Sequence, residues 1–239
     1  MSRKVFDDFD GFAGDYRQIH NEGLKISGAE SDYFSEQKIE EVKRNEVGQS
    51  PVVLDLGCGD GNSAKFFQKH FAGCKYYGLD TSQESVSVAA DRNLAGAEFS
   101  HFDGLNIPFP EEKFDLVFIA CVLHHVDSGE HENILNEIKR VLKPGGRLYI
   151  FEHNPLNPVT RHIVNSCPFD EDAVLLNASY TKKVLRKLNF REISISYTIF
   201  FPRHKIFAGM LSFEKYLKWL PIGGQYYARS VKGGEDSQA

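Results

Sequence analysis

A glycine-rich turn is the part of the sequence best suited to binding a ligand. Gly57, Gly59 and Gly61 follow the apolar segment VVLDL (52–56), whose fourth residue is Asp55, and they precede an amphipathic segment. Glycines permit positive φ and let a ligand pack against bare backbone, and the N-terminus of a helix offers unpaired amide donors. The spacing is GxGxG, whereas the fingerprint that binds a pyrophosphate is GxGxxG. A carboxylate beside the loop would repel a diphosphate, so the motif favours a ligand that carries an ammonium group.

A second acid lies at the end of the next apolar segment. Asp80 ends KYYGLD, about 20 residues beyond the glycines, where dinucleotide-binding folds place an acid that binds ribose hydroxyls. An acid at the end of a strand is more often a helix cap or part of a solvated turn. The spacing from the glycine turn therefore favours a ribose-binding role for Asp80.

Two pairs of titratable residues follow later apolar segments and could accept a proton from a substrate. His124 and His125 come after FDLVFIACVL, and Glu152 and His153 come at the end of GRLYIFEH. We rank them as general bases in the order His153, Glu152, His124, His125, because the proline-braced chain after His153 is the less generic of the two sites. The histidine pair could instead hold loop structure. The spacing of these residues matches no recognised set of metal ligands, so no metal site is predicted.

These residues must be positioned by alternating strands and helices. From residue 52 onward, short apolar runs alternate with amphipathic stretches, which is typical of βαβ units and a mostly parallel sheet. Helices are predicted over 61–70, 82–93, 129–142 and 181–188, the last with Thr181 as its N-cap. Seven runs are candidate strands: VVLDL, KYYGLD, AEFSHF, FDLVFIACVL, GRLYIFE, REISISYTIF and QYYARSV.

Three segments interrupt this alternation and should carry substrate-specific pieces. They are residues 1–50, 153–180 and 199–223. We expect an N-terminal helical cap or lid over 1–50 and a main domain over 51–239, with the other two segments inserted on the substrate side. An aromatic stripe at helical spacing is more often plain packing than a lid. The stripe that predicts the N-terminal helix consists of Phe9, Phe12, Ala13, Tyr16 and Ile19.

Four motifs in this order resemble the class I S-adenosylmethionine-dependent methyltransferase superfamily, in particular its small-molecule, type 11-like members. They are DLGCGDG, GLD, HFDGLNIPFPEEKFDLVFIACVLHHV and LKPGGRLYIFE, and the resemblance covers residues 50–152. It implies an α/β fold with a Rossmann-like, seven-stranded, mostly parallel sheet in the order 3-2-1-4-5-7-6, with helices on both faces and helical caps. It also places the ligand outside the carboxyl ends of the strands, where the strand order reverses.

The resemblance further implies S-adenosylmethionine as the cofactor and assigns residues to its parts. Asp55 would orient the ammonium group, directly or through water, and Tyr16 would cover the cofactor as part of the lid. The remaining assignments are Gly57, Cys58 and Gly59 to the methionine part, Asp80 and Thr81 to the ribose, Asp103 and Gly104 to the adenine, and Ala120 and Cys121 to a wall from the fourth strand.

Composition and charge limit the partners and the compartment. The 239 residues are 41% hydrophobic and 26% charged, with a net charge of -5, so the chain lacks the positive field that holds a phosphate backbone and nucleic acid is not expected. The four cysteines show no CxxC spacing and are expected to be reduced thiols. The acidic N-terminal segment lacks the apolar core of a signal peptide, and no apolar run is long enough to span a bilayer. A cytoplasmic protein is therefore expected.

Together these patterns predict a methyltransferase that uses S-adenosylmethionine to methylate a small-molecule acceptor at oxygen or nitrogen. A non-catalytic adenosyl-binding or scaffold protein of the same fold is the alternative, and an NAD-dependent oxidoreductase is disfavoured by the glycine spacing and its preceding acid. In the insertions, Arg161, His162 and Arg203 could meet an acidic acceptor group, although a solvated position is the commoner outcome for each. The aromatic residues of 199–223 could meet lipid-like material or another copy of the chain.

Overall fold

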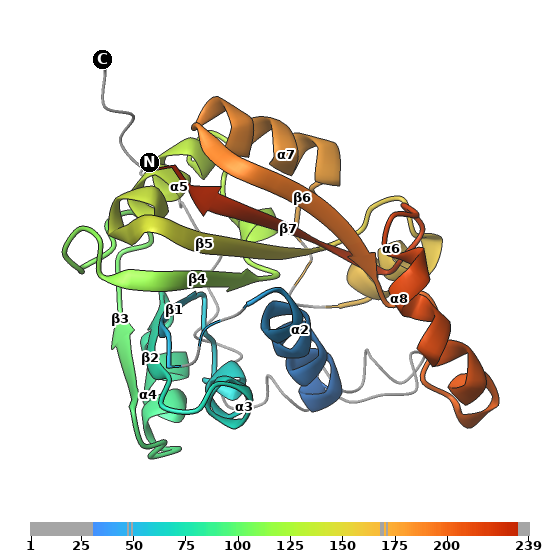
Figure 1. Cartoon of the computed structure of the whole chain (residues 1–239), viewed down its shortest axis with the longest axis horizontal. Helices are drawn as coiled ribbons and strands as arrows, with labels where there is room; N and C mark the ends of the chain where they lie inside the picture. Colours follow the sequence, from blue (N-terminus) through green and yellow to red (C-terminus); the bar gives the residue numbers. More distant parts are fainter. Residues whose placement is uncertain (1–30, 47, 49, 168–169, 171, 234–239) are drawn as a thin grey trace.

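A seven-stranded sheet organises the part of the chain that the structure describes (Figure 1). The structure is a computed structural model and describes residues 31–46, 48, 50–167, 170 and 172–233. The spatial order is β3-β2-β1-β4-β5-β7-β6, with β7 antiparallel to β5 and β6 and the other pairs parallel. The expected fold class is thus confirmed. The strands are β1 Val52–Leu56, β2 Lys75–Asp80, β3 Ala97–His101, β4 Phe114–Ala120, β5 Leu142–His153, β6 Phe190–Thr198 and β7 Gln225–Lys232.

Helices cover both faces of this sheet. Alternate residues of β4 point to opposite sides, so Leu116 and Phe118 join an apolar cluster with side chains of α2 and α3, whereas Val117 and Ile119 join a cluster with side chains of α5 and α7. All four residues are almost fully buried, as is usual for parallel strands covered on both faces. The helices are α2 Ser31–Asn45, α3 Asn62–His70, α4 Gln83–Ala90, α5 His131–Val141, α6 Pro158–Asn165, α7 Ala178–Lys187 and α8 Glu214–Leu217, with 3-10 helices η3 Leu123–His125 and η5 Lys205–Phe213.

The start of α7 corrects one prediction. The helix begins at Ala178, and its N-cap is Asn177, whose side chain accepts a hydrogen bond from the backbone N–H of Tyr180 at 2.8 Å. Thr181 lies within the helix, with its hydroxyl 2.8 Å from the hydroxyl of Tyr226. The prediction of Thr181 as the cap was wrong because Asn caps a helix at least as well as Thr, and here it stands earlier in the chain.

The fourth strand ends before its apolar run does. β4 stops at Ala120, and the next residue, Cys121, has φ 59, a left-handed conformation that few residues with a Cβ adopt. The chain then enters η3, which carries His124 and His125. The reversal at Cys121 thus brings both histidines to the carboxyl end of the sheet.

The two insertions meet beyond the end of β5, where the side-chain amide of Asn157, the N-cap of α6, donates to the carbonyl of Ile222 at 2.7 Å. The base of the second insertion is closed by backbone hydrogen bonds. The N–H of Gly224 donates to the carbonyl of Ile199 at 2.8 Å, and the N–H of Asn154 donates to the carbonyl of Gly224 at 3.0 Å. The segment 199–223 therefore leaves and re-enters the sheet at one fixed point.

The N-terminal segment is described only from residue 31. The predicted helix over residues 9–19, with Tyr16, lies outside the described residues, and α2 is the helix found in the remainder of 1–50. None of the helices in the described ranges has both the length and the apolar character needed to cross a membrane.

Candidate functional site

A cavity of about 260 Å³ opens at the carboxyl ends of β1, β2, β4 and β5. It lies where the strand order reverses, which is the usual ligand position in an open α/β sheet. Asp103, Gly104 and Glu152 are not among the described residues that line it, and Tyr16 is not described. The predicted site residues that line it are Asp55, Gly57, Cys58, Gly59, Asp80, Thr81, Ala120, Cys121, His124, His125 and His153.

The glycine turn presents bare backbone to this cavity. Gly57 has φ 76, and a Cβ there would lie 2.4 Å from Cγ2 of Val122, so only glycine fits without a shift of its neighbour. Gly59 has φ 53, and a Cβ there would meet no atom within 4 Å. The turn is anchored to β2, because the N–H groups of Gly57 and Cys58 both donate to the carbonyl of Leu79, at 2.8 and 3.0 Å. A ligand can therefore approach the backbone at Gly59 closely.

Asp80 holds the glycine turn in place and can also accept a hydrogen bond from a ligand. Its Oδ2 accepts from the N–H of Gly59 at 2.7 Å, and its Oδ1 accepts from the N–H of Ser82 at 2.9 Å. Burial raises the pKa of this carboxyl, and the backbone hydrogen bonds oppose that rise. The backbone N–H of Thr81 is a third donor to this carboxylate, so of its about four acceptor positions at least one remains for a ligand hydroxyl.

The carboxyl group of Asp55 is almost completely buried. It is 2% exposed, and the hydroxyl of Tyr76 donates to it. Burial raises the pKa of Asp55 to about 7, although the Tyr76 hydrogen bond acts in the opposite direction. A bound cation would stabilise the ionised form, so the site suits an ammonium group. Lys38 of α2 lines the same cavity and was not singled out from the sequence, since one lysine on a helix carries no signal.

Glu152 is buried behind the cavity and acts on His124. It is 0% exposed; its Oε2 lies 2.5 Å from Nδ1 of His124, and its Oε1 accepts from the N–H of Leu123 at 3.0 Å. Both oxygens are therefore used to hold η3 in place. The position of Glu152 does not bring it into contact with an acceptor in the cavity.

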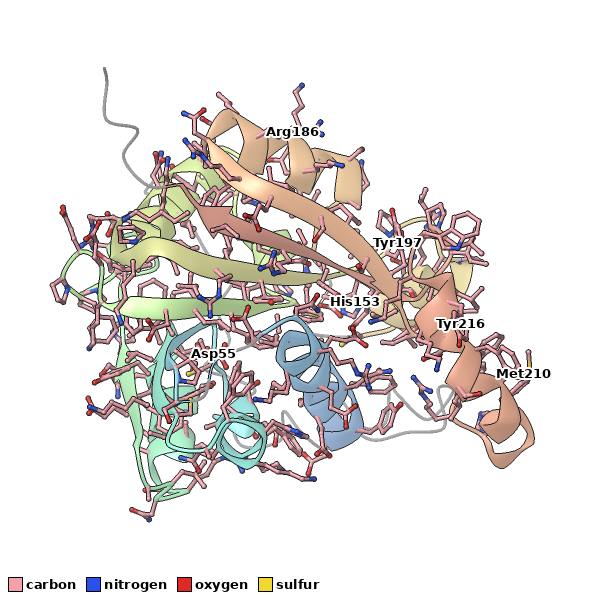
Figure 2. All side chains as sticks on the ribbon, viewed as in Figure 1. Asp55, His153, Arg186, Tyr197, Met210 and Tyr216 are labelled. Carbon is pink, nitrogen blue, oxygen red and sulfur yellow. The ribbon has the colours of Figure 1, made fainter. Side chains whose placement is uncertain are left out.

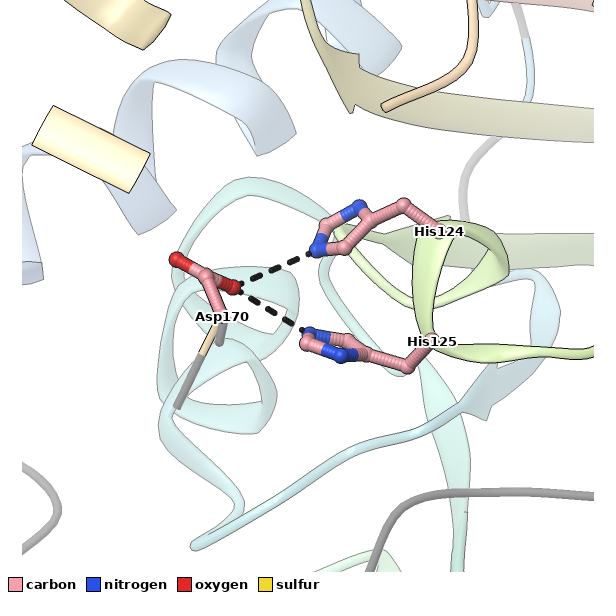
Figure 3. A group of neighbouring side chains, drawn as sticks. All are labelled: His124, His125 and Asp170. Atoms are coloured by element: carbon pink, nitrogen blue, oxygen red, sulfur yellow. Dashed lines mark ion pairs between the residues drawn. The ribbon is translucent and has the colours of Figure 1, made fainter. Parts of the chain in front are cut away.

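The other ring nitrogen of His124 faces a residue that the sequence did not indicate, Asp170. Oδ1 of Asp170 is 3.5 Å from Nε2 of His124 and 3.3 Å from Nε2 of His125 (Figure 3). We call these three residues the His–Asp cluster. Burial would lower the pKa of His124, but the charge of Glu152 and the contacts with both carboxylates outweigh it, so the pKa is raised. Burial would raise the pKa of Asp170, but the neighbouring histidines hold it well below its usual range.

His153 ends β5 and lines the cavity beside this cluster. Its ring centroid is 5.4 Å from that of His124. Burial, with the charge of His124, lowers the pKa of His153 to about 4. Its partner in β7 is Gln225, which also lines the cavity and whose Oε1 is buried without a hydrogen-bond partner in the described part of the chain. Figure 2 shows Asp55 and His153 on the sheet, with Met210 and Tyr216 farther out on η5 and α8.

Several predicted site residues have other local roles. The exposed carboxylate of Asp103 accepts from the N–H groups of Leu105 and Asn106, at 2.8 and 2.7 Å, and thus closes its own turn. Arg161 and His162 are exposed on α6 and do not line the cavity. In the second insertion, Arg203 forms an ion pair with Glu214 at 2.8 Å. None of these three side chains lines the cavity.

Comparison with known proteins identifies the central part of the chain. Residues 54–150 match the family model described as a methyltransferase domain. A fatty-acid O-methyltransferase of Mycolicibacterium smegmatis is 34% identical over 104 residues, which are 43% of this chain and 37% of that protein. A thiol S-methyltransferase of Rattus norvegicus is 26% identical over 227 residues, which are 87% of this chain and 80% of that protein.

Solved structures agree in fold over nearly the whole chain. A SAM-dependent methyltransferase from Thermotoga maritima has a TM-score of 0.67 at 20% identity, covering 94% of this chain and 97% of that one. The chain spans less than half the length of the fatty-acid O-methyltransferase. By their names, the two sequence relatives act on acceptors as different as a fatty acid and a thiol.

Proposed function

We propose that this protein uses S-adenosylmethionine to methylate a small-molecule or lipid-like acceptor, and the match of residues 54–150 to the methyltransferase domain model supports the proposal. The observation that carries the proposal is the shared cavity. The glycine turn, Asp55 and Asp80 line one part of it, and His153 with the His–Asp cluster lines another. Groups suited to the cofactor thus lie beside groups suited to an acceptor.

The residues of the first part fit S-adenosylmethionine. When bound, this cofactor supplies a methyl group on a positively charged sulfur, which makes the carbon ready for attack. Asp55 would hold the ammonium group, because its carboxyl is desolvated and faces the cavity. Asp80 would accept from the ribose hydroxyls, and the open backbone at Gly59 would border the methionine part. Asp103 and Gly104 remain the residues assigned to the adenine by resemblance.

The second part would receive the acceptor. Thr160 and Ile163 of α6 line it, and so does Ile199 at the base of the second insertion. These side chains mix apolar and hydroxyl surface, which suits an acceptor with an apolar body and one polar atom to be methylated. Oxygen and nitrogen are the acceptor atoms that we propose.

For a hydroxyl acceptor, we assign the proton-accepting role to His153, since it lines the cavity at the end of β5. Glu152 is then a positioning residue, because its two oxygens hold His124 and the backbone of η3. His124 and His125 stand next to His153 and remain the second and third candidates. An amine acceptor would need less help, since it loses its proton more easily, and positioning with exclusion of water would then suffice.

The proposal is tested by incubating the full chain with tritiated S-adenosylmethionine and fractionated extract, and by identifying the labelled product. Calorimetry with S-adenosylhomocysteine and NAD accompanies it. Binding of S-adenosylhomocysteine with labelled product supports the proposal. Binding without any labelled product would favour the non-catalytic adenosyl-binding alternative, and binding of NAD alone would overturn the cofactor assignment.

A further inference from the structure

We propose that the His–Asp cluster binds a divalent first-row transition-metal ion inside the cavity. Both imidazole rings are turned toward the same carboxylate (Figure 3). Oδ1 of Asp170 is 3.5 Å from Nε2 of His124 and 3.3 Å from Nε2 of His125, and the three ligand atoms lie within 4.8 Å of one another. Ligand distances of ~2.0–2.2 Å are typical of imidazole and carboxylate groups and require the ligand atoms to lie within about 4.4 Å of one another, so a small inward shift of these side chains would place all three on one ion.

The orientation of His124 is that of a metal-ligating histidine. Its Nδ1 is 2.5 Å from Glu152, which fixes the ring. Its side chain is 1% exposed. Its Nε2 has no hydrogen-bond partner in the described part of the chain, because the 3.5 Å between this nitrogen and Oδ1 of Asp170 satisfies the distance for an ion pair but not the geometry of a hydrogen bond. Histidines that bind metals usually donate the other ring N–H to a carboxylate, which directs the second nitrogen to the ion. A metal ion would satisfy a buried nitrogen that is otherwise costly.

The charges around this nitrogen also favour a cation. Glu152 and Asp170 lie on opposite sides of His124, and their side chains are 0% and 13% exposed. Buried carboxylates are costly unless they are paired or bind a metal. An ion of charge +2 bound at His124 would balance the negative charges of both Glu152 and Asp170.

The ligand types select the class of ion. Imidazole suits zinc, copper, iron and nickel, whereas magnesium and calcium prefer sites built from oxygen. Three protein ligands also leave coordination positions for water or a substrate atom, as in catalytic zinc sites. Zn²⁺ and its spectroscopic substitute Co²⁺ are therefore the probes for this site, and Mg²⁺ is the contrasting ion.

The site lies beside His153, in the part of the cavity that would receive the acceptor. An ion here would hold a hydroxyl oxygen of the acceptor and favour its deprotonated form; this role, unlike metal binding itself, rests on the proposed methyl transfer. The spacing of the histidines in the sequence predicts no metal site. The third ligand, Asp170, comes from the insertion after β5, whose path the sequence does not define.

A second group of possible ligands provides an internal control. Glu36, Glu40 and His70 lie close together on α2 and α3. Lys69 and His70 contact Glu36 at 2.6 and 3.0 Å, and Arg44 contacts Glu40 at 3.0 Å. Glu36 and Glu40 are paired with Lys69 and Arg44, which unlike histidine have no lone pair to offer a metal, and the position is more open, so we assign no metal to it.

The test is a titration of the full chain with Co²⁺ and Zn²⁺ after treatment with a chelator, read by Co²⁺ absorption and by calorimetry. Wild-type protein should bind one ion per chain, and Mg²⁺ should not displace it. Asp170→Asn and His125→Asn should each remove saturable binding. Glu152→Gln should weaken it by about 10- to 100-fold, the usual effect of losing a carboxylate behind a histidine ligand. His70→Ala should bind as the wild type does.

Binding of S-adenosylhomocysteine to the metal-free variants keeps the two proposals separate and reports on folding. Absence of saturable binding to the wild type, unchanged binding in both ligand variants, or loss of binding in His70→Ala would overturn the metal site and leave methyl transfer standing. Intact Co²⁺ binding in a protein that binds no S-adenosylhomocysteine would instead overturn the proposed function.

Discussion

Asp55 should make the stability of the cofactor-free protein fall as the pH rises. Burial raises the pKa of this carboxyl to about 7, against an ordinary value of 3.8. One unit of pKa shift corresponds to about 1.4 kcal/mol, so ionisation of Asp55 destabilises the folded state by about 4 kcal/mol relative to the unfolded state. The folded pKa lies above the unfolded one, so the protonated carboxyl favours folding. Its contribution is complete below about pH 4 and is lost as the pH rises to about 7.

Urea denaturation of the wild type and Asp55→Asn, at about pH 5.5 and about pH 8, measures this contribution. Asparagine keeps an acceptor for the hydroxyl of Tyr76. The wild type should lose about 2 kcal/mol more than the variant between the two pH values, since about 1.5 pH units of the interval lie below the folded pKa.

Asp115→Asn is the matched control for this experiment. Partial burial favours a higher pKa for Asp115, but the ion pair with Lys143, at 2.7 Å, leaves it lowered. Asp115 is therefore ionised in both states across the interval, and its variant should keep the wild-type loss of stability. Equal losses in the wild type and Asp55→Asn would refute the reasoning about burial.

Four further predictions concern the cavity. Affinity for S-adenosylhomocysteine should rise with pH toward about 7 in the wild type, by up to about tenfold per pH unit, and calorimetry should find no such rise in Asp55→Asn. Asp80→Ala should weaken that affinity by about 1.5–3 kcal/mol, the scale of hydrogen bonds to a charged acceptor, with circular dichroism confirming the fold; unchanged affinity would exclude the ribose role. His153→Ala should lower kcat on a hydroxyl acceptor by about 10²- to 10⁴-fold without changing cofactor affinity, and a near wild-type kcat would point to catalysis by proximity alone. Gly57→Ala should lower the free energy of unfolding by about 1–3 kcal/mol because of its positive φ and the contact with Val122; Gly59→Ala, with open space around it, is the comparison variant and should cost less.

The strands and the cofactor side of the cavity follow from local sequence. The short apolar run VVLDL is typical of a buried parallel strand and has the bounds of β1, whereas the run FDLVFIACVL continues three residues past the end of β4. Asp55 belongs to β1 and Asp80 ends β2, so predicting these two strands also predicts where both side chains lie. The sequence does not predict the pKa of Asp55, which depends on burial by the surrounding fold.

The part of the cavity around the His–Asp cluster depends on contacts between distant segments. Asp170 reaches His124 from the insertion after β5, and Lys38 reaches the cavity from α2. Neither segment has a periodic pattern that fixes its path over the sheet. Glu152 was ranked as a base from its position at a strand end, but the alternation of β5 directs it into the protein, where it contacts His124.

The closed base of the second insertion makes residues 199–223 a replaceable module. Ile199 and Gly224 are joined by a backbone hydrogen bond, and Gly224 is also tied to Asn154 at the end of β5. A change in the length or sequence of η5 and α8 can therefore occur without altering the register of β6 against β7. A chimera that exchanges only η5 and α8 between relatives should therefore fold around an unchanged sheet, with Ile199 and Gly224 still joined at the base of the segment.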